Sequence, residues 1–230
     1  MGLALAVGVL ADLKEVDPEG FEFHAAALER LSRYMKSCKL PLHQEPEDCD
    51  VWSGQMIGYS GLHDLRRIAA YLDAGAPLPA PATGDSSEDS CIAGYYDSVD
   101  GRRPGLLKRL FGPRATCMRG FDHLIVHGDA EGYYLPTDFP EVLFPPADLE
   151  IPGGMVGSST RLLAELDRIA AALAIPDSLT PDAEDLWQAA DEPSKGGDLW
   201  RQYGRESFCC VTLRHGCRQS IATGAALVFT

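Results

Sequence analysis

The sequence predicts an α+β fold, in which a small mixed or antiparallel sheet packs against several helices. Apolar, strand-like runs lie near both ends of the chain, and amphipathic helical patterns lie between them without a strict strand–helix alternation. The 230 residues are 45% hydrophobic and 23% charged, values that suit a folded core and exclude disorder as the main state. We therefore expect one α+β domain over residues 1–230.

The N-terminal third contains one strand signal and two helix signals. Residues 3–10 are almost wholly apolar and predict a buried strand. Asp17 followed by Pro18 is typical of an N-cap and first helical position, and apolar residues at three- and four-residue steps extend this helix to about Ser37. The same periodicity predicts a second helix over residues 60–72.

Residues 75–120 predict a loop-rich, partly basic insertion. Proline, glycine and serine interrupt every regular pattern in its first half. Between Gly101 and Phe121 there are six of the chain's 20 basic residues and no Asp or Glu. This segment could close onto acidic residues of the chain or act as a separate contact arm.

The segment after the insertion predicts a β-hairpin. Residues 122–127 show an alternating polar and apolar pattern with β-branched side chains, which predicts a strand. Residues 128–132 have the composition of a turn, and Tyr133–Leu135 can return as a second strand.

Three helices and a strand are predicted for the C-terminal part. Ser158 and Ser159 open a helix that ends before Pro176, and Thr180–Pro181 opens a short helix to about Ala190. A last, interrupted helix covers roughly residues 199–220, and residues 225–229 form a final strand that can share a sheet with residues 3–10.

The net charge of −14 argues against a dedicated nucleic-acid binder and against adsorption to anionic lipid. No run approaches the roughly 18–20 apolar residues that span a membrane. The seven cysteines form no Cys-x-x-Cys pair, which excludes a zinc ribbon or thioredoxin motif. Without a signal peptide, these cysteines are expected to be reduced thiols of a cytoplasmic protein.

Acidic residues gather in two stretches of the sequence. Residues 120–160 contain seven acidic residues and residues 176–194 contain six, and neither stretch contains Lys or Arg. Tyr and Phe accompany the first stretch, a pattern that suits a surface binding a basic protein, although the aromatics could equally lie in the core beneath a solvated acidic face. The predicted partner-binding residues are Asp129, Glu131, Tyr133, Tyr134, Asp138 and Glu141.

A weaker signal for metal or acid–base chemistry lies in the same hairpin. His123, His127 and Asp129, joined by the distant His63, are candidate ligands for Zn²⁺ or another divalent metal. On one strand, however, His123 and His127 would lie about 13 Å apart, and a polar hairpin turn is the alternative.

Other candidate catalytic groups lack their motifs. The glycine-rich run 153–160 has no Gly-Lys-Ser/Thr ending, so it does not match a P-loop. Ser158, Ser159, Cys209 and Cys210 lie in no recognised nucleophile setting. We therefore assign no catalytic residue.

Four segments together resemble a family of small uncharacterised bacterial proteins: residues 1–8 (MGLALAVG), 127–136 (HGDAEGYYLP), 138–144 (DFPEVLF) and 152–159 (PGGMVGSS). The resemblance covers about two thirds of the chain and omits the insertion. It implies no established activity. In general type, such small acidic bacterial proteins resemble the immunity proteins of toxin systems.

These observations favour a non-enzymatic binding protein without a cofactor, whose partner is a basic toxin or effector. The alternative is a metal-dependent hydrolase or related enzyme that uses the histidine and carboxylate cluster. A third possibility, a small-ligand sensor, requires a large apolar pocket.

Overall fold

A computed structural model describes residues 3–84, 86–87, 89–102, 120–128 and 131–229, with residues 99–102 described by their backbone alone. It confirms the predicted α+β class. Five short strands form one sheet: β1 (Ala4–Val7), β2 (Trp52–Gln55), β3 (Tyr133–Leu135), β4 (Val156–Ser158) and β5 (Leu227–Phe229). Their order is β2-β1-β5-β3-β4, and all neighbours are antiparallel except the parallel pair β3 and β4.

The two terminal strands do lie side by side. Leu5 of β1 pairs with Phe229 of β5, and the other edge of β1 pairs with β2. Because the side chains of a strand alternate between the two faces of a sheet, this sheet buries apolar groups on both sides. Leu5, Val7 and Leu227 face one core, whereas Val228 faces the other.

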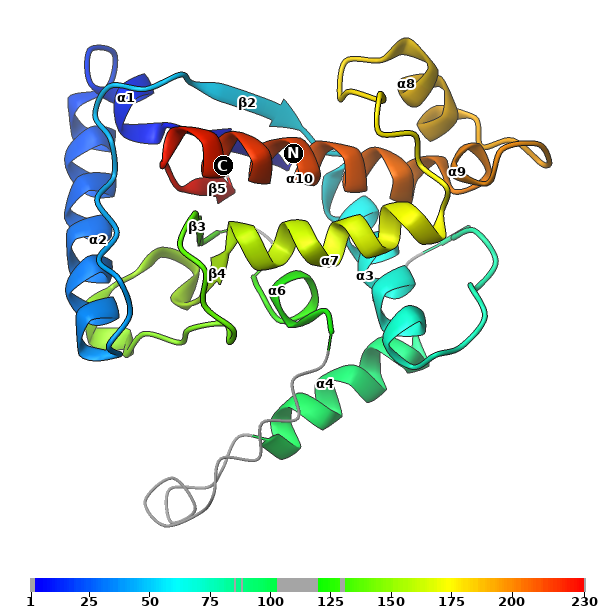
Figure 1. The fold of residues 1–230 in the computed structure, drawn as a ribbon, viewed down its shortest axis with the longest axis horizontal. Helices are drawn as coiled ribbons and strands as arrows, with labels where there is room; N and C mark the ends of the chain where they lie inside the picture. The colour runs from blue at the N-terminus through cyan, green and yellow to red at the C-terminus, as the bar shows by residue number, and fades with distance from the viewer. Residues whose placement is uncertain (1–2, 85, 88, 103–119, 129–130, 230) are drawn as a thin grey trace.

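Helices cover both faces of the sheet (Figure 1). The short α1 (Val9–Leu13) and the long α2 (Pro18–Ser37) pack with one face. The opposite core contains residues of α3 (Gly58–Asp73), α6 (Asp122–Ile125), α7 (Ser159–Ala172), α8 (Glu184–Asp191) and α10 (Gly204–Thr223). The remaining described helices are α4 (Ser90–Arg102) and α9 (Leu199–Gln202), with single turns of 3-10 helix at Ala147–Leu149 and Pro152–Gly154.

Local capping fixes the best-predicted helices. The side chain of Asp17 accepts a hydrogen bond from the Gly20 N–H at the start of α2, and Ser158 accepts one from the Arg161 N–H at the start of α7. By contrast, α8 begins at Glu184, after the predicted Thr180–Pro181 start.

The predicted strand over residues 3–10 ends at Val7, because Val9 and Leu10 begin α1, and two further segments have the wrong secondary structure. The 122–127 segment is the helix α6 rather than a strand, so β3 is not half of a hairpin and pairs instead with β4 and β5. Residues 90–102 of the predicted insertion form the helix α4 rather than a loop. The basic segment 103–119 lies outside the described residues.

Gly204 allows α10 to lie close against α8. A Cβ atom at this position would clash with the Ala189 carbonyl oxygen, which belongs to the α8 backbone and cannot rotate away. Gly204→Ala is therefore expected to destabilise the fold by about 3 kcal/mol. Urea unfolding measures the effect, and Gly196→Ala is the control because a Cβ there meets no atom within 4 Å. Equal stability of both variants would contradict the close approach.

Candidate acidic binding surface

The predicted aromatic anchors do not face solvent. Tyr133 and Tyr134 are 0% and 1% exposed, on opposite faces of the sheet, so these two predicted partner-binding residues belong to the core. The Tyr133 hydroxyl lies 2.8 Å from His24 Nδ1, and the Tyr134 hydroxyl donates to the His123 carbonyl oxygen. Neither tyrosine can contact a partner while the sheet is intact. The alternative considered from sequence, aromatics inside and acids outside, describes this region better.

The predicted carboxylates that the structure describes, Glu131, Asp138 and Glu141, lie at the surface and have different partners. Glu131 is exposed and accepts a hydrogen bond from the Gly153 N–H. Asp138 forms a two-point ion pair with Arg161, which neutralises its charge locally. Glu141 is exposed. Asp129 lies outside the described residues.

The structure places His123 in the core with both ring nitrogens engaged. Its Nδ1 accepts a hydrogen bond from the Ser158 N–H at 3.0 Å, and its Nε2 lies 3.3 Å from the Pro140 carbonyl oxygen. Because Nδ1 accepts, the proton of the neutral ring belongs on Nε2. Burial lowers the pKa of His123 to about 4.

His127 is also buried, but both of its ring nitrogens face carbonyl oxygens, so the neutral ring can donate a hydrogen bond to only one of them. Its ring nitrogens lie 3.2 Å from the Gly128 and Tyr133 carbonyl oxygens, and its ring stacks on Tyr134 at 3.9 Å. His63 lies on α3, where it lines a surface pocket with Tyr59, Ser60 and Arg205. Within the described part of the chain, no three His, Cys, Asp or Glu side chains come together as metal ligands. The structure thus does not assemble the predicted His63, His123 and His127 cluster.

We expect His123 and His127 to stay neutral in the folded protein down to about pH 4. Burial lowers the pKa of His127 to about 4 as well, whereas both imidazoles of the unfolded chain take up protons near pH 6.5. Their contribution to stability is therefore present above pH 6.5 and is lost as the pH falls through about 4. Histidine Cε1–H signals recorded by NMR across this range should include two that do not shift above about pH 5. Six titrations centred near pH 6.5 would contradict this assignment.

The structure brings a different set of carboxylates together at the N-terminal corner. Two adjoining segments, residues 12–22 and 47–50, contain eight exposed acidic residues, which we together call the N-terminal acidic patch: Asp12, Glu15, Asp17, Glu19, Glu22, Glu47, Asp48 and Asp50. Lys14 is the only basic residue within these two segments, and it pairs with Glu47 at 3.0 Å. Among the described residues, no Lys or Arg lies at ion-pair distance from the other seven carboxylates. The net formal charge of the patch, eight acids against one base, is −7.

Backbone pairing is what joins the two segments. β1 leads into α1 and β2 follows residue 50, and Val7 pairs with Trp52 across the two strands. Gly8, with φ of +81°, turns the chain between β1 and α1 beside Cys49 and Asp50. The start of α2 and the approach to β2 therefore meet at one end of the molecule (Figure 1).

Exposed apolar side chains accompany these carboxylates. Val16 is 76% exposed, Phe23 56% and Val51 47%, and all three lie within or next to the acidic segments. Protein-binding surfaces combine apolar contact groups with polar ones in this way.

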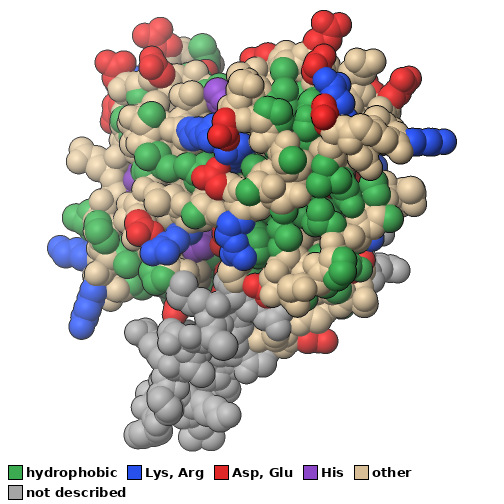
Figure 2. Space-filling view, turned by 45° about the vertical axis from the view of Figure 1, so that its right-hand side comes forward, with side chains coloured by type: hydrophobic (Ala, Val, Ile, Leu, Met, Phe, Trp, Pro, Cys, Tyr) green, Lys and Arg blue, Asp and Glu red, His purple; other side chains and the backbone are tan. Residues whose placement is uncertain are grey.

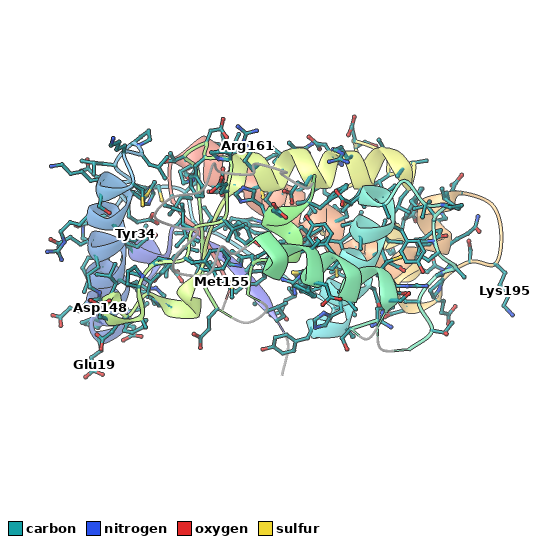
Figure 3. All side chains as sticks on the ribbon, turned by 90° about the horizontal axis from the view of Figure 1, so that it is seen from below. Glu19, Tyr34, Asp148, Met155, Arg161 and Lys195 are labelled. Carbon is teal, nitrogen blue, oxygen red and sulfur yellow. The ribbon has the colours of Figure 1, made fainter. Side chains whose placement is uncertain are left out.

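The charge of α2 changes sign along its length. Acidic residues occupy its first two turns, whereas Arg33, Lys36 and, just beyond its end, Lys39 are exposed near its C-terminal end. Each sign complements the helix dipole. Glu19, near the start of α2, projects into solvent at one end of the molecule, and Lys195 projects into solvent at the opposite end (Figure 3).

Sequence reasoning missed the N-terminal acidic patch although part of the signal was present. Residues 12–22 contain five acidic residues and residues 45–50 contain four, but each run is shorter than the 120–160 stretch. Their proximity depends on strand pairing that the sequence did not predict, because β2 was not identified.

The fold and this surface define a small acidic α+β protein with an exposed, largely unneutralised carboxylate face. The chain belongs to the family described as "Putative DNA-mimic protein", whose family model matches residues 1–229. No curated protein and no solved structure matches the chain. A match over nearly the whole chain is consistent with the resemblance to an uncharacterised family.

The family assignment corrects the functional prediction. The chain was predicted to be an immunity protein that neutralises a basic toxin or effector. This prediction is wrong, because the description of the family is that of a DNA mimic and not of an immunity protein. The family gives no support to the alternative, a metal-dependent hydrolase. An acidic protein that acts through protein–protein contact remains consistent with the family. No described helix is long and apolar enough to cross a membrane.

Proposed function

We propose that this protein binds a DNA-binding protein on its DNA-contacting surface, with the N-terminal acidic patch in the place of phosphates. The observation that carries this proposal is the set of eight exposed carboxylates with a single basic residue among them. The family description supports the same reading. Such a partner would place the protein in the cytoplasm, and no cofactor or catalytic residue is needed.

The physical basis is the chemistry that DNA-binding proteins use for phosphates. Duplex DNA carries one negative charge per roughly 1.7 Å of helix axis, and Lys and Arg side chains neutralise these charges at the protein surface. Carboxylates offer Lys and Arg the same charge-assisted hydrogen bonds. The net charge of −14 would also steer the protein toward a basic surface from a distance.

The patch differs from DNA in a way that favours a protein partner. Duplex DNA presents a continuous charged backbone, whereas here Val16, Phe23 and Val51 lie among or beside the carboxylates. These apolar groups would add contact area that does not weaken with salt. A subset of DNA-binding proteins, with an apolar contact beside the basic surface, would therefore bind most tightly.

The test is capture followed by competition with DNA. The full chain is immobilised and exposed to the host proteins that bind DNA-cellulose, and retained proteins are eluted with a 30-base-pair duplex. The eluted protein, purified, is the captured partner. Fluorescence polarisation of a labelled duplex then measures whether the free chain displaces DNA from it.

Competition is the required outcome. The chain should release the labelled duplex from the captured partner at stoichiometric concentrations, and a ternary complex of chain, partner and DNA should not form. A captured protein that holds the duplex and the chain together would reject the proposal, as would retention of no DNA-binding protein.

A further inference from the structure

We propose that the outer face of α8 is a second contact surface for the same DNA-binding partner, with Trp187 as its anchor. This inference rests on the proposed function and adds the place and chemistry of a second contact. The α8 surface comprises Glu184, Trp187, Gln188 and Asp191 on one helical face, flanked by Asp182, Asp185 and Glu192.

The helix separates buried from exposed positions cleanly. Leu186, Ala189 and Ala190 are buried, and the close approach of Gly204 to Ala189 fixes α8 against α10. Positions 184, 187, 188 and 191 recur at three- and four-residue steps and are all exposed. No described element covers this outward face, so it is available to a partner.

Trp187 presents a large apolar side chain to solvent in a restrained orientation. Its side chain is 43% exposed, and its ring packs edge-on against the buried Phe208 with ring centroids 4.4 Å apart. This contact restrains the indole, so little conformational freedom remains to be lost on binding. Tryptophan is among the residues most enriched at the energetic centres of protein interfaces.

The charge around Trp187 specifies a basic occupant. Residues 176–198 contain seven acidic residues and one Lys. Arg201 pairs with Asp185 and lies near Asp198, and Arg214 pairs with Asp177. Within the described part of the chain, Asp182, Glu184, Asp191 and Glu192 have no Lys or Arg at ion-pair distance. A second copy of this acidic face, or a nucleic acid, would be repelled here.

The two acidic surfaces lie along one edge of the molecule. In Figure 1, α8 and the start of α2 lie at opposite ends of the long axis, both at the upper edge. The turned view of Figure 2 keeps the same vertical direction and shows acidic side chains at the upper left and upper right. One partner that extends along this edge would contact both surfaces, and the second contact would then form at a high effective concentration.

The test compares two independent changes in the α8 surface with a matched control. Trp187→Ala removes the anchor, and Glu184→Lys with Asp191→Lys reverses the two charges that share the helical face with Trp187, at exposed positions outside the core. Each is expected to weaken binding of the captured partner about 10-fold, measured by isothermal titration with the full chain. Phe144→Ala, at a residue 41% exposed, is the control and should change affinity less than about 2-fold.

A second readout follows Trp187 itself. Trp200 is buried and Trp52 is partly buried, so acrylamide, a neutral quencher, should reach mainly Trp187 in the free chain. Addition of the captured partner should reduce this quenching in the wild-type chain and leave the Trp187→Ala chain little changed. Thermal unfolding of each variant confirms that it is folded.

The outcomes separate this inference from the function on which it rests. Full affinity in both α8 variants, with binding still lost on charge reversal in the N-terminal acidic patch, would overturn the second contact and leave the proposed function intact. Self-association that depends on Trp187 in sedimentation experiments, without an effect on the partner, would also overturn it. A chain that captures no DNA-binding protein overturns both.

Discussion

Reversal of three charges in the N-terminal acidic patch is expected to weaken binding of the captured partner about 100-fold, as Glu15→Lys, Asp48→Lys and Asp50→Lys together. The three side chains are exposed and lie in turns or loops, so the changes leave the core intact. Each reversal removes one attraction to a basic surface and adds one repulsion, at roughly 0.5 kcal/mol for each of the six terms. The sum of about 3 kcal/mol corresponds to the expected loss of affinity.

The control carries the same change in net charge at another place. Asp97→Lys, Glu141→Lys and Asp148→Lys together also alter the charge by six units, and all three residues are exposed. Affinity for the captured partner should fall by less than about 3-fold in this variant. Isothermal titration at two salt concentrations measures both variants. An equal loss in the two would show that net charge, rather than the patch, governs binding. Because Glu141 belongs to the partner-binding set predicted from sequence, this control also tests that prediction.

Arg66→Met is expected to lower the free energy of unfolding by about 3–5 kcal/mol. Arg66 is 1% exposed and connects α3 to the end of α6. Its guanidinium donates to the Leu124 carbonyl oxygen at 2.8 Å, to that of His127 at 2.6 Å and to that of Gly128 at 3.4 Å. Methionine fills similar space without a donor, so the carbonyl groups at the end of a four-residue helix lose their partner.

Urea unfolding followed by circular dichroism measures this loss. Arg33→Met provides the comparison, because Arg33 is exposed on α2 and lies 3.9 Å from Glu29 in a surface pair. That variant should change stability by no more than about 0.5 kcal/mol. A loss below about 1 kcal/mol for Arg66→Met would mean that water or other groups replace the guanidinium at the carbonyl oxygens.

The sequence alone determined the elements whose ends are marked by local chemistry. Asp17 with Pro18 and the cap at Ser158 act on N–H groups within three residues, so the positions of α2 and α7 follow from short segments. The two terminal strands were also identified, because a short, wholly apolar run is typical of a buried strand. Their pairing is confirmed by the structure.

Tertiary contacts decided the 122–127 segment. Glu165 accepts the N–H groups of His123 and Leu124 at one end of α6, from 42 and 41 residues away. Burial raises the pKa of this carboxyl well above its usual value. Arg66 binds the carbonyl oxygens at the other end from 58 and 61 residues away. A short-range pattern contains neither partner, so the alternation of residues predicted a strand where Glu165 and Arg66, both distant in sequence, stabilise a helix.

The same distinction applies to the binding surface. Counting charges along the chain showed that the protein is acidic and favoured a basic partner, because formal charge needs no fold. It could not show which acidic residues share a face or which aromatics are buried. The pairing of β1 with β2 brings residues 12–22 and 47–50 together, while the β3 strand places Tyr133 and Tyr134 in the two cores. The acidic character was therefore fixed by composition, and the shape of the carboxylate surface by hydrogen bonds between strands far apart in sequence.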